Sequence, residues 1–555
     1  MLLNDPMALG HRPWHDPHGA TVLSSGVPPK DAPAGNHSLV LSAVEPGVMG
    51  VPSSKLTIVG SGDRLERKVF ATSRLAEFYS KSELEKQTGH PVDPLVILKE
   101  LVDNAADEAE KSGIAPVIEI TVANGEIVIA DNGPGIAAAT VERVLDFNVR
   151  VSDKEAYVSP TRGAQGNALK TIIAMPYVLD GKRGETVIEA RGIRHSVLFE
   201  ADPIRREPRV TYEPTRGKVK TGTRVTVRWP VSASSQLEAA KARFLLFAAD
   251  FAFLNPHLTL RVTWGSKRWI NTKAAASVWT KWSPADPIPA HWYPLDRFER
   301  LITAHIANDQ DQGSETTVRD FVASFRGLSG SIKRTAILDD INASRLSLAK
   351  FYDDGCNHDG VARLLAAIRD MSKPVKPKDL GVIGRDHLEY RFREAGAELE
   401  TFKYIAKFDT TDDLPWGVEI AFAWYPASSR RLITGVNFSP AIINPFRHLG
   451  DWQSLDDVLG EQRASPDEPV MALVHLVCPR LSFTDRGKTA LVLGDVYITD
   501  DEIDETELAQ APNSVEREIG DAIIDAVTKV TATWAKKRAR LRSVTIGPRS
   551  AGASG

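Results

Sequence analysis

The chain has 555 residues, of which 42% are hydrophobic and 25% are charged, and its formal net charge is −4. This length exceeds one ordinary hydrophobic core, so about two to four domains are expected. The balanced charge excludes a wholly basic nucleic-acid binder but leaves room for a local basic groove. The two cysteines, Cys356 and Cys478, have no neighbouring Cys/His partners. That spacing argues against a disulfide framework or a structural zinc site and is typical of the reducing cytoplasm. We find neither a long apolar run nor a secretory signal layout, so no membrane association is expected.

The first part of the chain predicts a helix layer on a mostly antiparallel sheet. Residues 1–55 are rich in Pro, Gly, His and Ser and are expected to form a flexible tail. A helical pattern runs from Arg74 to Ala109, with a break at GHPVDP. Strand-like runs follow, namely VIEITVA, EIVIADNG, ETVIEARG, HSVLFEA and RVTVRW. We therefore place the first domain at residues 56–265.

A helix-rich stretch from about residue 315 to 371 precedes a proline-marked boundary, KPVKPKDLG. Strand-like segments return at WGVEIAFAWY, RRLITGVNF, MALVHLVCP and TALVLGDVYI. One long helix is predicted at about Ser514–Arg542, because its apolar residues recur at three- or four-residue steps. These patterns predict a linker and helical domain at 266–372, a strand-rich domain at 373–545 and a short tail at 546–555.

The stretch ELVDNAADEA, residues 100–109, places Glu100, Asp103, Asn104 and Asp107 at helical spacing, which predicts one shared helix face. A solvated face is the ordinary interpretation of such a cluster. However, asparagine is a weak helix former and a suitable neutral ligand for a hard cation such as magnesium. Glu100 also follows directly on ILK and precedes LV, so it lies near the buried edge, where a carboxylate is a candidate general base for activating water.

Three further segments carry candidate ligand contacts. EIVIADNGPGI ends a strand at Asp131, whose carboxylate can accept a hydrogen bond from the exocyclic amine of a base. Its glycines let the backbone approach a ligand, although DNGPG alone is equally compatible with a simple turn. TRGAQGNALKT leads into a helix, where backbone N–H groups and Lys170 make an anion site. KTGTRVTVRW places Thr223 just inside a strand.

In this order, the four elements resemble the Bergerat-type (GHKL) ATPase superfamily, which includes gyrase B subunits, the heat-shock chaperone, mismatch-repair clamps and sensor histidine kinases. The resemblance implies an α+β fold whose first domain is an α/β sandwich that binds ATP and Mg²⁺. Glu100 would orient the attacking water, and Asn104 would hold magnesium against the phosphates. Asp131 would bind the adenine amine with support from Thr223. The other implied nucleotide-binding positions are Asp107, Gly133, Gly135, Lys154, Gly163, Gln165, Gly166, Asn167, Ala168 and Lys170.

Within the superfamily the chain resembles the B subunit of topoisomerase VI. TSRLAEFYSKSELEKQTGH is similar to that family's first helix and strap, and VSDKEAYVSPTRGAQGNALK to its serine-lysine segment and lid. TTVRDFVASFRGLSG resembles the start of its small helix-two-turn-helix insert. PKDLGVIGRDHL, PWGVEIAFAWY and GVNFSPAIINPFR resemble its link and its transducer domain, which ends in a long C-terminal helix. Two departures are Gly381-Val382 for a usual serine-proline, and Asn167-Ala168 where a third lid glycine is usual. The second departure concerns lid motion and hydrolysis rate rather than nucleotide binding.

The resemblance also implies that Lys488, in SFTDRGKTALVL, is a catalytic lysine on the terminal phosphate; an exposed hairpin lysine is the alternative. The implied function is that of an ATP-hydrolysing subunit of a type IIB topoisomerase complex. It would dimerise on binding ATP and gate the passage of double-stranded DNA with a separate A subunit that cleaves DNA. We expect no DNA cleavage by this chain alone, because it has no winged-helix stretch and no acidic DxD cluster in a strand context.

Two alternatives remain open at this point. One is a stand-alone ATP-operated DNA clamp of the mismatch-repair or chromatin-compaction type, which a neighbouring gene for a tyrosine-bearing A subunit would distinguish. The other is a nucleotide-gated scaffold. Glu100 argues against the scaffold, because a site that only binds nucleotide has no use for a water-activating carboxylate.

Overall fold

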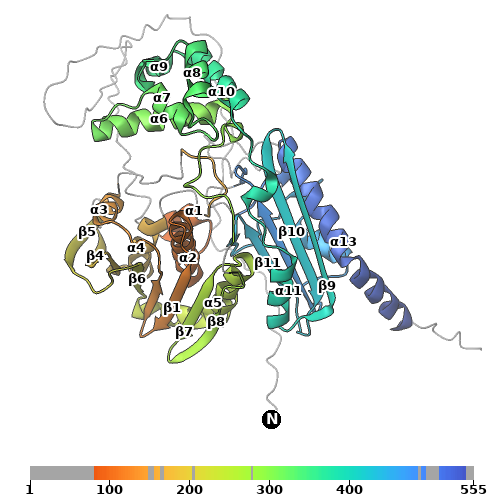
Figure 1. Cartoon of the computed structure of the whole chain (residues 1–555). Helices are drawn as coiled ribbons and strands as arrows, with labels where there is room; N and C mark the ends of the chain where they lie inside the picture. Colours follow the sequence, from red (N-terminus) through yellow and green to blue (C-terminus); the bar gives the residue numbers. More distant parts are fainter. Residues whose placement is uncertain are drawn as a thin grey trace, which may run out of the picture. The chain divides into compact units, whose positions relative to one another are not determined.

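The computed structural model describes residues 81–147, 156–162, 168–202, 207–276, 279–484, 489–495 and 512–545. All of them belong to one compact unit that begins at Ser73. They form an α+β fold with an eight-stranded sheet and its helices, a group of short helices, and a five-stranded sheet with a long helix (Figure 1). The tails predicted at 1–55 and 546–555 lie outside the described residues.

The eight-stranded sheet has the order β5-β4-β3-β6-β2-β1-β7-β8. Its strands are β1 (Val117–Ala123), β2 (Glu126–Ala130), β3 (Gly184–Ala190), β4 (Ile193–Asp202), β5 (Glu207–Arg216), β6 (Thr223–Arg228), β7 (Thr259–Trp264) and β8 (Lys267–Thr272). Only the β1–β7 pair is parallel, which agrees with the predicted mostly antiparallel sheet. The sheet continues beyond the domain boundary expected at residue 265. That boundary is wrong because β8 returns as the second strand of a hairpin and pairs with β7.

Helices cover one face of this sheet. They are α1 (Lys81–Thr88), α2 (Pro94–Lys111), α3 (Ala138–Leu145), α4 (Ala168–Asp180) and α5 (Ser234–Leu254). Helix α2 begins where Asp93 accepts a hydrogen bond from the Leu95 N–H at 2.9 Å, with Pro94 in the first turn. Its apolar side chains, such as Leu98 and Val102, join alternate residues of β1 in one buried core. The sheet thus fixes α2, which carries the acidic motif.

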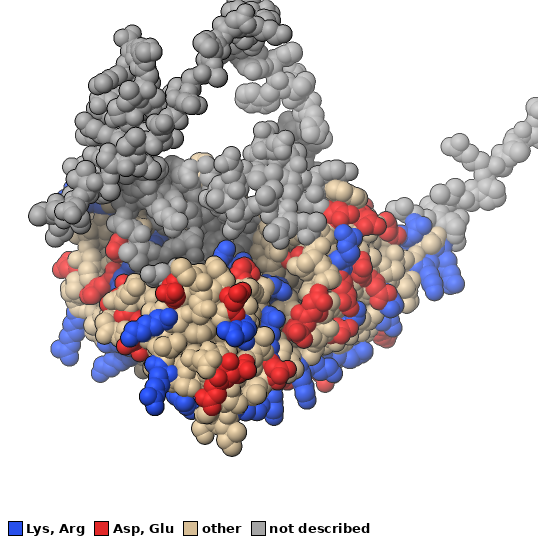
Figure 2. Space-filling view, turned by 90° about the horizontal axis from the view of Figure 1, so that it is seen from above, with Lys and Arg blue, Asp and Glu red and all other residues tan. Residues whose placement is uncertain are grey.

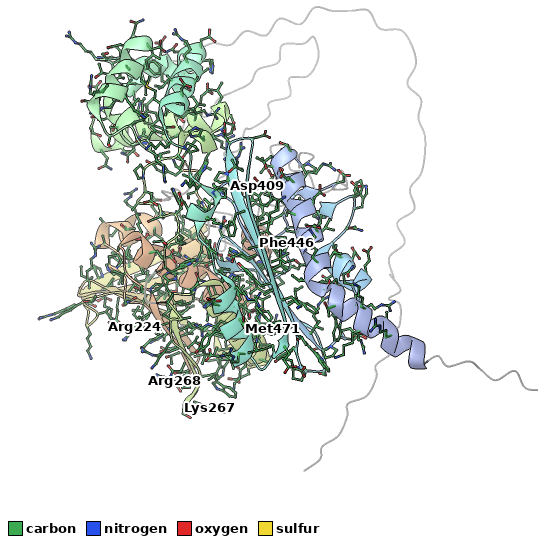
Figure 3. The ribbon with its side chains drawn as sticks, turned by 45° about the vertical axis from the view of Figure 1, so that its right-hand side comes forward. Arg224, Lys267, Arg268, Asp409, Phe446 and Met471 are labelled. Atoms are coloured by element: carbon green, nitrogen blue, oxygen red, sulfur yellow. The ribbon has the colours of Figure 1, made fainter. Side chains whose placement is uncertain are left out.

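The other face of the sheet carries charges of both signs. Arg228 pairs with Glu126 and Glu185, and Arg261 pairs with Glu119. Arg224, Lys267 and Arg268 also project from this sheet (Figure 3). On the surface visible in Figure 2, basic and acidic side chains are likewise intermingled. These surfaces therefore do not form a groove of a single charge sign.

The short helices form a group of their own, in which side-chain caps start three of them. Thr317, Ser347 and Asn357 each accept a hydrogen bond from the backbone N–H three residues ahead. The helices are α6 (Leu295–Gln312), α7 (Val318–Ala323), α8 (Ser331–Asp340), α9 (Leu348–Tyr352) and α10 (His358–Met371). The helical region therefore begins with α6, about one helix earlier than the pattern from residue 315 predicts.

The five-stranded sheet has the order β12-β11-β14-β10-β9, and a two-stranded pair, β13–β15, accompanies it. The strands are β9 (Glu398–Thr411), β10 (Leu414–Trp424), β11 (Arg431–Val436), β12 (Ser439–Pro440), β13 (Leu449–Gly450), β14 (Val470–Val477) and β15 (Leu493–Gly494). The accompanying helices are α11 (Arg385–Glu394), α12 (Leu455–Glu461) and α13 (Ser514–Thr545).

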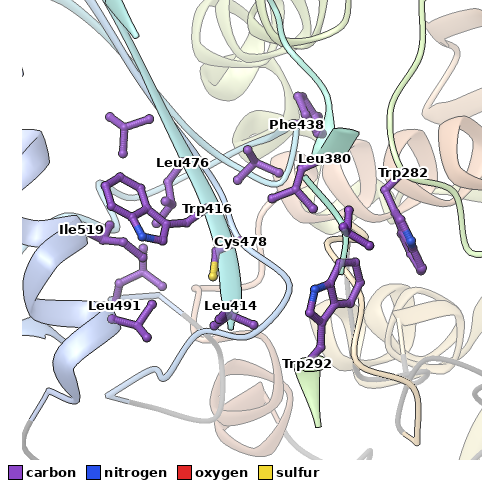
Figure 4. Packing of buried hydrophobic residues seen from close by; sticks show 14 of the residues in the cluster. Trp282, Trp292, Leu380, Leu414, Trp416, Phe438, Leu476, Cys478, Leu491 and Ile519 are labelled. Atoms are coloured by element: carbon purple, nitrogen blue, oxygen red, sulfur yellow. The ribbon is translucent and has the colours of Figure 1, made fainter. Parts of the chain in front are cut away.

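Helix α13 packs against β9, β10, β13 and β15. Strand β14 is buried along its whole length, which explains why its sequence is apolar except for His475. Trp416 of β10, Leu476 of β14 and Ile519 of α13 lie close together in this core (Figure 4). Helix α13 confirms the long helix predicted from residue 514. Among the described residues, no helix combines the length and apolarity needed to cross a membrane.

Candidate nucleotide-binding site

The polar residues of α2 differ in how deeply they are buried. Glu100 and Asn104, one turn apart, are half-buried, whereas Asp103 and Asp107 are only 1% and 4% exposed. At 3.6 residues per turn the four positions fall within an arc of about 100°, so they share one face of α2, as predicted, with Asp103 and Asp107 on its more buried side. The Asn104 amide makes no hydrogen bond within the described part of the chain, so it can take an external ligand.

Asp131 follows the end of β2 and is held by the backbone. Its Oδ1 accepts hydrogen bonds from the N–H of Gly133 at 2.8 Å and of Thr223 at 3.1 Å. The Asp131 N–H in turn donates to the Thr223 carbonyl at 2.9 Å. These contacts fix the side-chain direction and leave Oδ2 as the acceptor for a ligand. Burial raises the pKa of Asp131, with a small contribution from the charge of Glu108, although the two N–H groups act in the opposite direction.

The DNGPG segment interlocks with the turn that precedes β6. The Gly222 N–H donates to the Gly133 carbonyl at 3.0 Å. A Cβ on Gly222, whose φ is +76°, would lie 1.9 Å from the Asp131 carbonyl oxygen, and one on Gly135 would lie 2.9 Å from the Gly222 oxygen. The Asn132 side chain links the segment to the start of β1. Its Oδ1 accepts a hydrogen bond from the Val117 N–H, and its Nδ2 donates to the Ala115 carbonyl. The glycines are thus required by close backbone contact, beyond the needs of a simple turn.

The predicted phosphate side of the site is only partly described. Helix α4 begins at Ala168, and Lys170, in its first turn, is buried. Lys170 Nζ donates to the Asp146 carbonyl at 2.7 Å and lies 5.8 Å from the centre of the Phe147 ring. Its role as a phosphate ligand stays a prediction. The predicted positions Lys154, Gly163, Gln165, Gly166, Asn167 and Lys488 lie outside the described residues.

A buried charge network that sequence reasoning missed involves two carboxylates of α2. Arg162, which is 1% exposed, donates to both carboxylate oxygens of Glu110 and to Asp107, each at 2.8 Å. Asn255 accepts a further hydrogen bond from Arg162, and Lys281 forms an ion pair with Glu110. Burial would raise the pKa of Glu110, but Arg162 and Lys281 hold it well below its usual range. The signal available in the sequence was the pair of carboxylates at 107 and 110, which follow the apolar stripe of this helix.

A cavity of about 290 Å³ adjoins the second half of α2. Asp107, Glu108 and Lys111 line one side, and residues of the 157–161 and 282–293 segments line the other. A Cβ on Gly133 would come within 3.7 Å of the Ala109 backbone, so the cavity and the Asp131 turn both flank this half of the helix. The cavity walls are polar where α2 contributes and include aromatic side chains from the opposite segments.

The residues present are compatible with magnesium that arrives with a nucleotide. Among the described residues, no group of three or more His, Cys, Asp or Glu side chains could hold a metal ion. Magnesium bound to phosphates usually keeps several waters and needs only one or two protein oxygens. The Asn104 amide, which has no hydrogen-bond partner among the described residues, can supply one such oxygen, so the donor set fits this kind of ion.

Residues 89–233 match the family model described as histidine kinase-, DNA gyrase B-, and HSP90-like ATPase. The chain therefore contains an ATPase domain of this family, which confirms the resemblance inferred from the four motifs. The matched residues include Glu100, Asn104, Asp131 and Thr223.

Two curated relatives carry the same protein name. The chain is similar to the B subunit of type 2 DNA topoisomerase 6 from Archaeoglobus fulgidus, with 22% identity over 191 residues, which are 33% of this chain and 31% of that protein. It is also similar to the protein of the same name from Halobacterium salinarum, with 24% identity over 225 residues, 38% of this chain and 27% of that protein. The matched region thus spans less than a third of these relatives' length.

Two solved structures share a distant likeness. One is the MutL ATPase domain of Aquifex aeolicus complexed with ADP, with 11% identity and a TM-score of 0.30 over 69% of this chain and 91% of that one. The other is the N-terminal domain of a DNA repair protein, with 12% identity and a TM-score of 0.36 over 82% of this chain and 98% of that one.

Proposed function

We propose that this chain is the ATP-binding and ATP-hydrolysing subunit of a topoisomerase VI-like, type IIB complex. Two copies dimerise when Mg²⁺-ATP binds and gate the passage of double-stranded DNA in the cytoplasm. A separate A-type subunit carries out DNA cleavage. The ATPase family match and the similarity to the B subunits of topoisomerase 6 support this proposal.

The geometry of Asp131 is the observation that best supports the proposed binding of ATP. One carboxylate oxygen is occupied by two backbone N–H groups, so the other is directed and available as a single acceptor. An acceptor of this kind suits the exocyclic amine of adenine, which is a donor. Gly133 and Gly135 shape the turn beside it, and Thr223 supports it from β6.

The chemical part rests on Glu100 and Asn104. Asn104 contributes an oxygen to magnesium, and Glu100 orients the water that attacks the terminal phosphate. The bound ion supplies charge stabilisation to the phosphates. Asp107, Lys154, Gly163, Gln165, Gly166, Asn167, Ala168 and Lys170 complete the proposed nucleotide contacts, and Lys488 contacts the terminal phosphate.

The test compares ATP turnover of the wild type, Glu100→Ala and Glu238→Ala, the last an exposed carboxylate on α5. We expect Glu100→Ala to bind a non-hydrolysable analogue normally but to lose turnover by about 10²–10⁴-fold, the usual contribution of a general base. Glu238→Ala should match the wild type. Unchanged turnover in Glu100→Ala would remove this residue from the mechanism.

The topoisomerase part has its own assay. Supplied with a tyrosine-bearing A-type subunit, the wild type should relax supercoiled DNA only in the presence of ATP, and Glu100→Ala should not. DNA relaxation that is independent of this chain would contradict the assignment.

A further inference from the structure

The hairpin of β11 and β12 turns at residues 437–438, between the paired ends at 436 and 439–440, and has an unusual backbone. Asn437 and Phe438 have φ values of 51° and 67°, so both occupy the left-handed region although neither is glycine. Phe438 is fully buried. A bulky residue in this region stores strain that the surroundings must hold, and such strain is concentrated at functional sites. We name residues 436–440 the docking turn.

The docking turn inserts Phe438 among residues from distant parts of the chain. Its ring lies 5.0 Å from the Trp279 ring and 4.6 Å from the His475 ring. The Phe438 N–H donates to His475 Nε2 at 3.1 Å. Its carbonyl accepts from Asn255 Nδ2 at 2.9 Å and from Arg162 Nε at 3.4 Å. Arg162 is therefore shared between the docking turn and the carboxylates of α2.

Ser439 adds a second connection, directly to α2. Its hydroxyl donates to Asp103 Oδ2 at 2.7 Å and accepts from Lys99 Nζ at 2.9 Å. Lys99 and Asp103 also pair with each other at 2.7 Å. All three groups are buried or nearly so, and such closed polar networks lose much when one member is removed.

The two pairs on α2 have the same spacing but different partners. Lys99 and Asp103 hold the docking turn, and Glu100 and Asn104, each one residue further along, form the proposed catalytic pair. Because the helix is rigid over one turn, a shift of Glu100 and Asn104 must move Lys99 and Asp103 with them. Arg162 immediately precedes the predicted glycine-rich lid, so the second connection begins at another part of the nucleotide site.

We propose that the docking turn transmits nucleotide binding from α2 to the five-stranded sheet, with Ser439 as the positioning residue. This inference rests on the proposed function, because it assigns the nucleotide to the Glu100–Asn104 face. It describes a connection built into the sheet itself through β11 and β12, separate from the predicted contact of Lys488. A purely structural clamp would hold the turn equally well but would not respond to nucleotide.

Hydrogen–deuterium exchange of residues 436–441 provides the test, since the Asn437 and Ala441 N–H groups are hydrogen-bonded to Leu476 and Thr434. The wild type, Ser439→Ala and Ser324→Ala are compared with and without a non-hydrolysable ATP analogue and magnesium. Ser324→Ala is the control, because it also deletes one serine hydroxyl hydrogen bond, a half-buried one to the Phe321 carbonyl in the helical group. Calorimetry measures analogue affinity in each protein.

We expect the analogue to slow exchange of the docking turn by about fivefold or more in the wild type and in Ser324→Ala, which is within the usual range of coupling between two linked sites. In Ser439→Ala we expect the analogue to slow exchange by less than about twofold. The same slowing in Ser439→Ala, or none in a wild type that binds the analogue, overturns the inference alone. Absence of analogue binding by the wild type overturns the proposed function as well. If Ser439→Ala does not fold, Lys99→Met, which removes the amine from the same network, takes its place with the same expected result.

Discussion

Replacement of Asp131 by asparagine tests the adenine contact with little change of shape. The Asn Oδ1 can still accept the N–H groups of Gly133 and Thr223, so the turn should stay folded. The amide nitrogen then takes the place of Oδ2 and presents a donor where adenine also presents a donor. A hydrogen bond to a charged group contributes about 1.5–3 kcal/mol, and about 1.4 kcal/mol is tenfold, so the Kd for ATP should rise about 10- to 140-fold.

Isothermal titration calorimetry with a non-hydrolysable analogue measures this change. Asp296→Asn is the control, since this carboxylate is exposed on α6 and, among the described residues, makes only a long ion pair with Arg297. We expect the control to bind as the wild type does, and thermal unfolding to show that Asp131→Asn is folded. Equal affinities for the wild type and Asp131→Asn would refute the assignment of Asp131 to adenine.

Three further substitutions test the packing around the site and the pH response. Gly222→Ala should lower the free energy of unfolding by about 1–3 kcal/mol, because the added Cβ would meet a backbone carbonyl at a residue with positive φ. The control Gly460→Ala in α12, whose Cβ would meet nothing within 4 Å, should leave that free energy unchanged. Thermal unfolding measures both. Arg162→Met should cost about 3–5 kcal/mol in urea unfolding, because it leaves buried carboxylates without their cation, and a loss below about 1 kcal/mol would contradict the network. Burial lowers the pKa of His387 to about 4 from its ordinary 6.5, so the folded state favours the neutral ring and stability is present above pH 6.5 and lost as the pH falls towards 4. In His387→Gln, the free energy of unfolding should fall by up to about 3 kcal/mol less between about pH 7 and pH 4 than it does in the wild type. His358→Gln, at an exposed position, should show the same fall as the wild type.

The parts of the fold with a regular pattern were predictable. Strand β1 alternates buried and less buried residues, and β14 is buried throughout and apolar except for His475, so both agree with their sequence patterns. Strands β5, β7, β8 and β9 escaped prediction. Of these, β5, β8 and β9 are edge strands, and EPRVTYEPTR and KRWINT are polar with little apolar alternation. Their place is set by pairing with a neighbouring strand, which local sequence does not reveal.

In the site, too, residues within local motifs were predictable and contacts between distant segments were not. Glu100, Asn104 and Asp131 belong to short local motifs, and the structure places the last of them in a defined hydrogen-bond geometry. The contact of Ser439 with Asp103 joins residues 336 positions apart, and that of Arg162 with Phe438 joins residues 276 apart. Neither contact follows from spacing along the chain, because both depend on how the two sheets are brought together.

Light scattering with and without a non-hydrolysable ATP analogue and magnesium measures whether ATP drives dimerisation. We predict a monomer that becomes a dimer only when analogue and magnesium are present. Asp131→Asn should stay monomeric at the same analogue concentration. An unchanged mass, in a wild-type protein that calorimetry shows to be saturated with analogue, would contradict the ATP-driven gate.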